Sequence, residues 1–105
     1  MKVEQLKTKI KVIFPEECEI FSVEESKNEL ITIFDSGEYK EKLVEIDLSK
    51  VESIDTTFFQ LILSFIKTLK NEEVKYKVKS VSERVQQVFE LYGVKLDIFL
   101  GGYDG

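Results

Sequence analysis

The residues with the clearest chemical potential are an acid and two hydroxyls in succession, Asp55, Thr56 and Thr57. A strand-like segment precedes them and a long apolar run follows, which predicts that they open a helix. Asp55 or Thr57 can cap that helix by accepting a bond from a free backbone amide, with Gln60 completing a Thr-x-x-Gln box. Capping needs one such residue, so three in a row indicate a second role. A hydroxyl here can also accept a phosphate favourably, because a helix N-terminus carries free amides and a partial positive charge.

Other kinds of chemistry find little support in the sequence. The chain has no histidine, which removes the commonest general base, the usual nucleophilic triads and most zinc sites. Its five glycines, at positions 37, 93, 101, 102 and 105, form neither common phosphate-binding loop. Neighbouring carboxylates such as Glu16 and Glu17 are typical of a solvated acidic face. We therefore expect a protein that is not an enzyme, with no catalytic residue, no metal site and no cofactor.

Length and charge set further bounds. A chain of 105 residues predicts one domain over residues 1–105, with a frayed tail from about residue 101. The net charge of −5 and the lack of a basic stripe argue against nucleic acid as a partner. The charged N-terminus does not resemble a signal peptide, and no apolar run is long enough to insert into a membrane. The single cysteine, Cys18, is expected to be a small buried hydrophobe in a cytoplasmic protein.

The hydropathy pattern predicts strands alternating with helices. Strands are expected at 9–14, 18–21, 43–48, 76–81 and 94–100, and helices at 23–34, 57–70 and 82–93. Ser22 and Ser80 each begin a Ser-x-x-Glu capping box, and Gly93 is placed to end the last helix.

This order of elements predicts an α/β fold. The strand at 43–48 alternates apolar and acidic residues, so one sheet face is packed and the other is partly wet. We expect a single-layer mixed, mostly parallel β-sheet of four or five strands, with the helices packed largely on one face.

The helix at 57–70 is apolar around most of its circumference, which is more than packing on one sheet face requires. Two explanations stay open. The helix is deeply buried between its neighbours, or Phe58, at an exposed helix start, belongs to a protein-binding surface.

Residues 46–57, Ile-Asp-Leu-Ser-Lys-Val-Glu-Ser-Ile-Asp-Thr-Thr, resemble the signature of STAS domains. That fold is shared by bacterial anti-sigma factor antagonists and by the C-terminal domains of sulfate transporters. In the family, a strand ending in Asp-Leu-Ser leads through a short loop to Asp, two small or hydroxyl residues and Gly at a helix start. The similarity extends over about residues 9 to 100, and Phe58 stands where the family has the glycine.

The resemblance implies a regulatory protein-binding module. In anti-sigma factor antagonists, a partner that is both kinase and anti-sigma factor phosphorylates the hydroxyl after the second Asp. The unphosphorylated antagonist binds that partner and frees the sigma factor, which regulates transcription. By position, the phosphorylated residue here is Thr56. The implied partner-binding residues are Ser22, Ser53, Asp55, Thr56, Thr57 and Phe58.

Three functions compete on the sequence. The first is an anti-sigma factor antagonist switched by phosphorylation at Thr56. The second is a constitutive STAS subunit of an ABC-transport or chemotaxis-type signalling complex, in which Thr56 makes contacts without a phosphate. The third, an enzyme or small-ligand-binding domain, is disfavoured by the absence of histidine and of a nucleotide loop. The sequence favours the phosphorylation switch.

Overall fold

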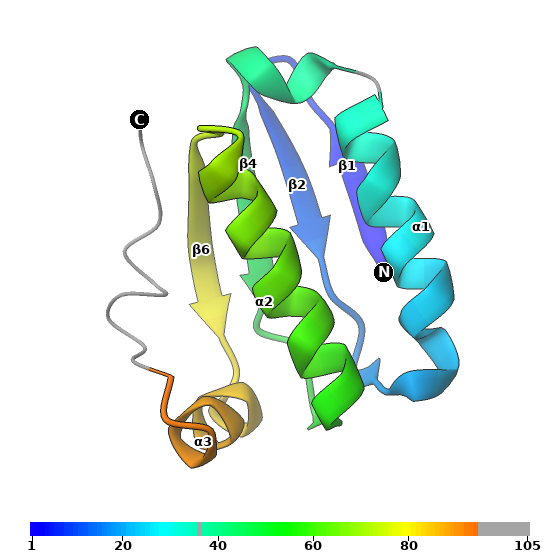
Figure 1. Cartoon of the computed structure of the whole chain (residues 1–105), viewed down its shortest axis with the longest axis vertical. Helices are drawn as coiled ribbons and strands as arrows, with labels where there is room; N and C mark the ends of the chain where they lie inside the picture. Colours follow the sequence, from blue (N-terminus) through cyan, green and yellow to red (C-terminus); the bar gives the residue numbers. More distant parts are fainter. Residues whose placement is uncertain (36, 95–105) are drawn as a thin grey trace.

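A four-stranded sheet forms one layer of the computed structural model, which describes residues 1–35 and 37–94 (Figure 1). The strands lie in the order β1 (Lys2–Gln5), β2 (Lys9–Ile13), β4 (Leu43–Leu48) and β6 (Tyr76–Val81). β1 runs antiparallel to β2, whereas β2, β4 and β6 are mutually parallel. The predicted mixed, mostly parallel sheet is thus confirmed.

The remaining elements are helices and one small second sheet. The helices are α1 (Ile20–Asp35), α2 (Thr56–Asn71) and α3 (Glu83–Leu91), with a short 3-10 helix η1 (Glu38–Glu41) after α1. β3 (Glu17–Cys18) and β5 (Ser53–Ile54) pair in parallel as the second sheet. α1 and α2 lie side by side over one face of the main sheet, and α3 lies beyond the end of β6 (Figure 1).

The core lies between the main sheet and the two long helices. On β4 the residues Val44, Ile46 and Leu48 are fully buried, while Glu45 on the opposite face is paired with Lys9 at 3.4 Å. This alternation is what a sheet packed on one face requires. α2 contributes six buried residues to the core: Phe58, Phe59, Ile62, Phe65, Ile66 and Leu69. The buried explanation for this apolar helix therefore holds.

The N-terminal part of the fold differs from the prediction. The charged segment that forms β1 carries too little alternation to be recognised as a strand. The expected strand at 18–21 is wrong, because pairing with β5 ends at Cys18 and α1 already begins at Ile20. Ser22 consequently lies inside α1, where its hydroxyl donates to the carbonyl of Glu19 at 3.1 Å. Its predicted capping role is also wrong.

The other helix ends are fixed by residues close to the predicted ones. Of the two caps predicted for α2, Asp55 is the one observed, so Thr57 lies inside the helix and the Thr-x-x-Gln box is not formed. Ser82 rather than Ser80 caps α3, because Ser80 is still paired in β6 and only Ser82 can accept from Val85, at 3.2 Å.

Gly93 follows α3 in the left-handed region, with φ of 73°, which confirms its role in ending the helix. The predicted last strand at 94–100, apart from Val94, and the predicted frayed tail lie outside the described residues.

Candidate functional site

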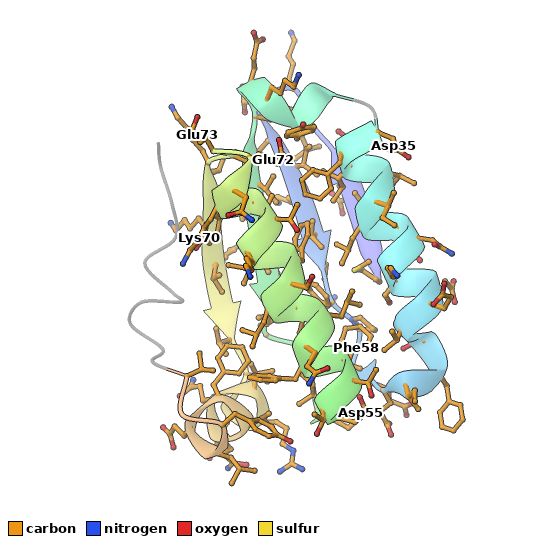
Figure 2. The ribbon with its side chains drawn as sticks, viewed as in Figure 1. Asp35, Asp55, Phe58, Lys70, Glu72 and Glu73 are labelled. Carbon is orange, nitrogen blue, oxygen red and sulfur yellow. The ribbon has the colours of Figure 1, made fainter. Side chains whose placement is uncertain are left out.

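The start of α2 lies at the end of the molecule where α1 begins and α3 ends (Figures 1 and 2). A hydrogen bond joins Asp55 to the first residue of α1, and another joins Thr56 to Tyr92 directly after α3. Three segments that are far apart in the sequence therefore meet around the Asp-Thr-Thr run.

Asp55 uses both carboxylate oxygens to hold two helices. Oδ1 accepts from the amide of Phe58 at 2.9 Å, which caps α2, and Oδ2 accepts from the amide of Ile20 at 2.7 Å, which anchors the start of α1. Its own amide donates to the carbonyl of Cys18 at 3.1 Å. Asp55 therefore has a structural role, because both of its carboxylate oxygens are hydrogen-bonded within the fold. The two threonines beside it are the exposed polar residues of this helix start.

Thr56 and Thr57 are both exposed on the first turn of α2. The Thr56 hydroxyl lies 2.6 Å from the hydroxyl of Tyr92, whose ring stacks on Phe59 with centroids 4.8 Å apart. Tyr92 lies near the end of the helix expected at 82–93, where nothing in its sequence neighbourhood marks it as a partner of Thr56. A hydrogen bond between residues 36 positions apart cannot be inferred from the local spacing of residue types.

Phe58 points into the core, not toward a partner (Figure 2). Its side chain is fully buried and packs edge-on against Phe14, with ring centroids 6.0 Å apart. The expectation that Phe58 lies exposed and binds a partner is wrong. Because Asp55 fixes where the helix begins, the two threonines face outward and the next residue faces inward.

The two serines of the predicted surface are engaged around Glu19. The Ser53 hydroxyl donates to the Glu19 carboxylate at 3.2 Å, and the Ser22 hydroxyl donates to the Glu19 carbonyl at 3.1 Å. Both side chains are half-buried. They lie in segments next to the start of α2, and both hydroxyls are hydrogen-bonded to Glu19.

Exposed apolar side chains lie at the two helix ends that are hydrogen-bonded to the start of α2. Ile20 and Phe21 of α1 are 58% and 96% exposed, and Leu91 and Tyr92 at the end of α3 are 78% and 47% exposed. Large exposed apolar groups at one end of a molecule are typical of a surface that binds another protein. We call these four residues together with Thr56 and Thr57 the helix-end surface.

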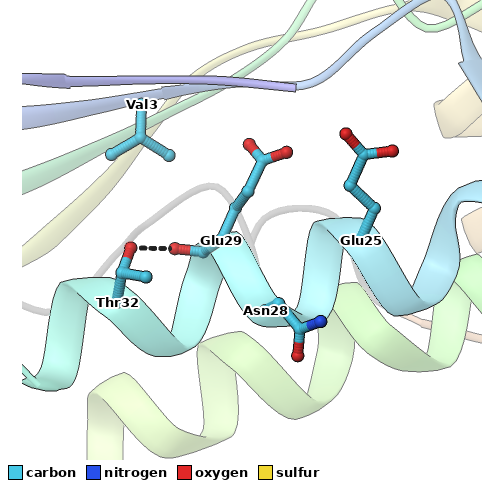
Figure 3. A pocket seen from close by; sticks show the side chains of 5 residues that line it. All are labelled: Val3, Glu25, Asn28, Glu29 and Thr32. Carbon is cyan, nitrogen blue, oxygen red and sulfur yellow. Dashed lines mark hydrogen bonds between the residues drawn. The ribbon is translucent and has the colours of Figure 1, made fainter.

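Two hollows lie away from the helix-end surface. One lies between β1 and α1 and is lined by Val3, Glu25, Asn28, Glu29 and Thr32 (Figure 3). The Thr32 hydroxyl there is bonded to the carbonyl of Glu29 at 2.6 Å. The other is a mostly apolar groove between α1 and α2. Among residues 1–35 and 37–94, no group of three or more acidic or cysteine side chains could hold a metal ion.

Cys18 is fully buried beneath this end of the molecule, as predicted for a small hydrophobe. Burial, opposed weakly by the N-terminal ammonium group, raises the pKa of its thiol to about 12. The reactive thiolate is therefore scarce in the folded protein.

We expect iodoacetamide at pH 8 to alkylate the native protein at least about a hundredfold more slowly than the urea-unfolded protein. Intact-mass spectrometry of timed samples measures both rates, and equal rates would contradict a buried Cys18.

No helix within the described ranges has the length and hydrophobicity needed to cross a membrane.

Comparison with known proteins identifies the family. The family model described as STAS domain matches residues 6–101. The NMR structure of the protein TM1081 is similar with a TM-score of 0.72 and 22% identity, over 97% of this chain and 78% of that chain. At this identity the likeness shows a shared fold. No curated protein matches the chain significantly. Because the family model covers most of its length, the chain belongs to the STAS domain family, a family of regulatory and protein-interaction modules.

Proposed function

We propose that the chain is a regulatory protein-binding module of the anti-sigma factor antagonist type. Its partner is an anti-sigma factor that is also a serine/threonine kinase, and phosphorylation at Thr56 switches the binding. The observation that carries the proposal is the exposed Thr56 hydroxyl on the first turn of α2, flanked by the exposed apolar side chains of the helix-end surface. The proposal includes a cytoplasmic location, a single domain and no catalytic activity of the chain itself.

The chemistry of the switch is a simple transfer. The Thr56 hydroxyl oxygen attacks the terminal phosphorus of a nucleoside triphosphate held by the partner. The bond between that phosphorus and the oxygen bridging it to the next phosphate breaks, and the nucleoside diphosphate leaves. The hydroxyl proton passes to a base of the kinase. The product carries a charge of about −2 at neutral pH.

The new charge acts differently on the fold and on the complex. Within the chain, the free amides and partial positive charge at the start of α2 tolerate a phosphate. Within a close apolar interface, the same group adds bulk and must lose its hydration, which opposes binding. The unphosphorylated form therefore binds the partner and the phosphorylated form releases it.

The test is a phosphomimetic substitution. We expect Thr56→Glu to weaken binding of the partner at least about tenfold, because one charge placed in an interface costs well over 1 kcal/mol. The partner is first isolated from the host with the tagged wild-type chain and identified by mass spectrometry. Its dissociation constants for the wild type and the variant are then measured by calorimetry.

Ser64→Glu is the matched control, because it adds the same charge at an exposed position further along α2. Circular dichroism must show that both variants stay folded. If Thr56→Glu unfolds the chain, Thr56 is structural. If the partner is bound equally by wild type and variant, the phosphorylation switch is refuted.

One observation favours a second function, the constitutive subunit of an ABC-transport or signalling complex. The Thr56 hydroxyl is already engaged at 2.6 Å by Tyr92, so it can form part of a fixed interface without a phosphate. This alternative predicts an ATPase or chemoreceptor component as the partner. It also predicts a chain that, purified from its host, lacks the added mass of a phosphoryl group.

A further inference from the structure

The contact between Thr56 and Tyr92 joins the first residue of α2 to the residue that follows α3. The two hydroxyl oxygens lie 2.6 Å apart, and either can be the donor. Tyr92 has a second anchor, because its ring stacks on Phe59, which is itself 4% exposed. Phe59 also packs edge-on against Phe89 of α3, with centroids 5.0 Å apart. The hydroxyl pair thus sits at the outer edge of a packed aromatic cluster.

The backbone around Tyr92 ends α3 in a defined way. The amides of Tyr92 and Gly93 donate to the carbonyls of Val88 and Glu90, both at 3.1 Å, and the amide of Val94 donates to Phe89 at 2.8 Å. This is the pattern of a helix closed by a left-handed glycine. Tyr92 thus stands within the hydrogen-bonded end of α3, and the amides of Gly93 and Val94 directly after it report on that end.

We propose that Tyr92 is a positioning residue for Thr56: its hydroxyl fixes the unmodified Thr56 side chain, and modification of Thr56 releases the Tyr92 ring. This inference rests on the proposed function for the modification step. Once Oγ1 is esterified to phosphorus it has no proton to donate and is a poorer acceptor. The phosphoryl oxygens are strong acceptors, but they lie beyond Oγ1, so a Tyr92 hydroxyl that donates to them has to leave the position it holds beside Thr56.

Release of Tyr92 changes the helix-end surface in shape as well as in charge. Tyr92 and its neighbour Leu91 supply the α3 side of that surface. A partner that docks on the unmodified chain meets a fixed aromatic ring beside Thr56. After modification the partner meets a negative charge together with a displaced ring, so the change affects the α3 side of the surface as well as the α2 side.

The test uses NMR on the chain of residues 1–105 and needs no kinase. Thr56→Val removes the hydroxyl with little change in shape, Tyr92→Phe removes the other hydroxyl and keeps the stacking ring, and a third variant carries both changes. Three-bond couplings to the Thr56 methyl carbon report whether its side chain holds one rotamer. Hydrogen exchange of the Gly93 and Val94 amides reports the end of α3.

In Tyr92→Phe we expect the Thr56 side chain to average over several χ1 rotamers instead of holding one. If Tyr92 only stabilised the fold, the Thr56 rotamer would not change. Each single variant should speed exchange of the two amides by about twofold to tenfold, the range expected from one net hydrogen bond. The double variant should add little, because both single changes break the same bond. Thr57→Val is the matched control and should change neither reading.

Thr56→Glu should free the Tyr92 ring in the same way, with faster exchange at Gly93 and Val94. Additive effects of the two single variants, or an unchanged Thr56 rotamer in Tyr92→Phe, would overturn the inference. These outcomes are independent of the partner. The two single variants can have non-additive effects on exchange while the partner binds wild type and Thr56→Glu equally well. That combination would refute the proposed switch and leave the positioning role of Tyr92 intact.

Discussion

Replacement of Phe58 by alanine is expected to lower the free energy of unfolding by about 3–5 kcal/mol. The ring is fully buried, and it packs edge-on against Phe14 of the sheet side of the core. The substitution removes that contact and leaves a cavity which the surrounding helices and strands cannot fill. Since domains of this size are stable by about 5–15 kcal/mol, the variant should be close to unfolding. Urea denaturation followed by circular dichroism measures the loss.

Phe21→Ala is the matched control for this prediction, because its ring is 96% exposed. Its effect on stability should stay within about 0.5 kcal/mol. The same variant should weaken partner binding if the helix-end surface is the docking surface. A small loss of stability in Phe58→Ala would show that this ring is not part of the core. Phe58→Gly should cost about 1 kcal/mol more than Phe58→Ala, because glycine is a poorer helix former.

Replacement of Asp55 by alanine is expected to cost about 2–4 kcal/mol. The substitution removes the cap of α2, at 2.9 Å from the Phe58 amide, and the bond to the Ile20 amide at 2.7 Å. Both amides are then left without these acceptors. The first turns of both helices should fray, which hydrogen exchange can resolve residue by residue, with urea denaturation giving the total.

Asp55→Asn separates the two bonds. Asparagine is as good a helix cap as aspartate, so its oxygen can keep the bond to Phe58. Its amide nitrogen then faces the Ile20 amide, two donors that cannot bond to each other. We expect a loss of about 1–2 kcal/mol, with fraying confined to the start of α1. The control is Asp35→Asn, at the exposed end of α1 (Figure 2). Equal fraying of α1 and α2 in Asp55→Asn would contradict this division of roles.

The same acid thus links stability to the candidate site. By fixing the first residue of α2, Asp55 places Thr56 and Thr57 outside and Phe58 inside. By binding Ile20, it also brings the exposed start of α1 beside the threonines. A substitution at Asp55 should therefore affect partner binding by shifting the positions of Thr56 and of the start of α1.

Several elements could be predicted because the information that specifies them is local. Alternation in residues 43–48 and 76–81 predicted β4 and β6, and Gly93 predicted the end of α3, because period-two burial and a left-handed residue are local properties. The motif at residues 46–57 likewise indicated the STAS family that the comparison confirms.

Tertiary structure decided what depends on distant partners. The start of α1 could not be predicted from Ser22. The amide of Ile20, the first residue of the helix, donates to the carboxylate of Asp55, which lies 35 residues further along the chain. The burial of Phe58 depends on Phe14 of a different segment, and the engagement of Thr56 depends on Tyr92. Local sequence specifies which residues can form a helix end or carry a hydroxyl, but packing between distant segments decides which of them face solvent and which are held.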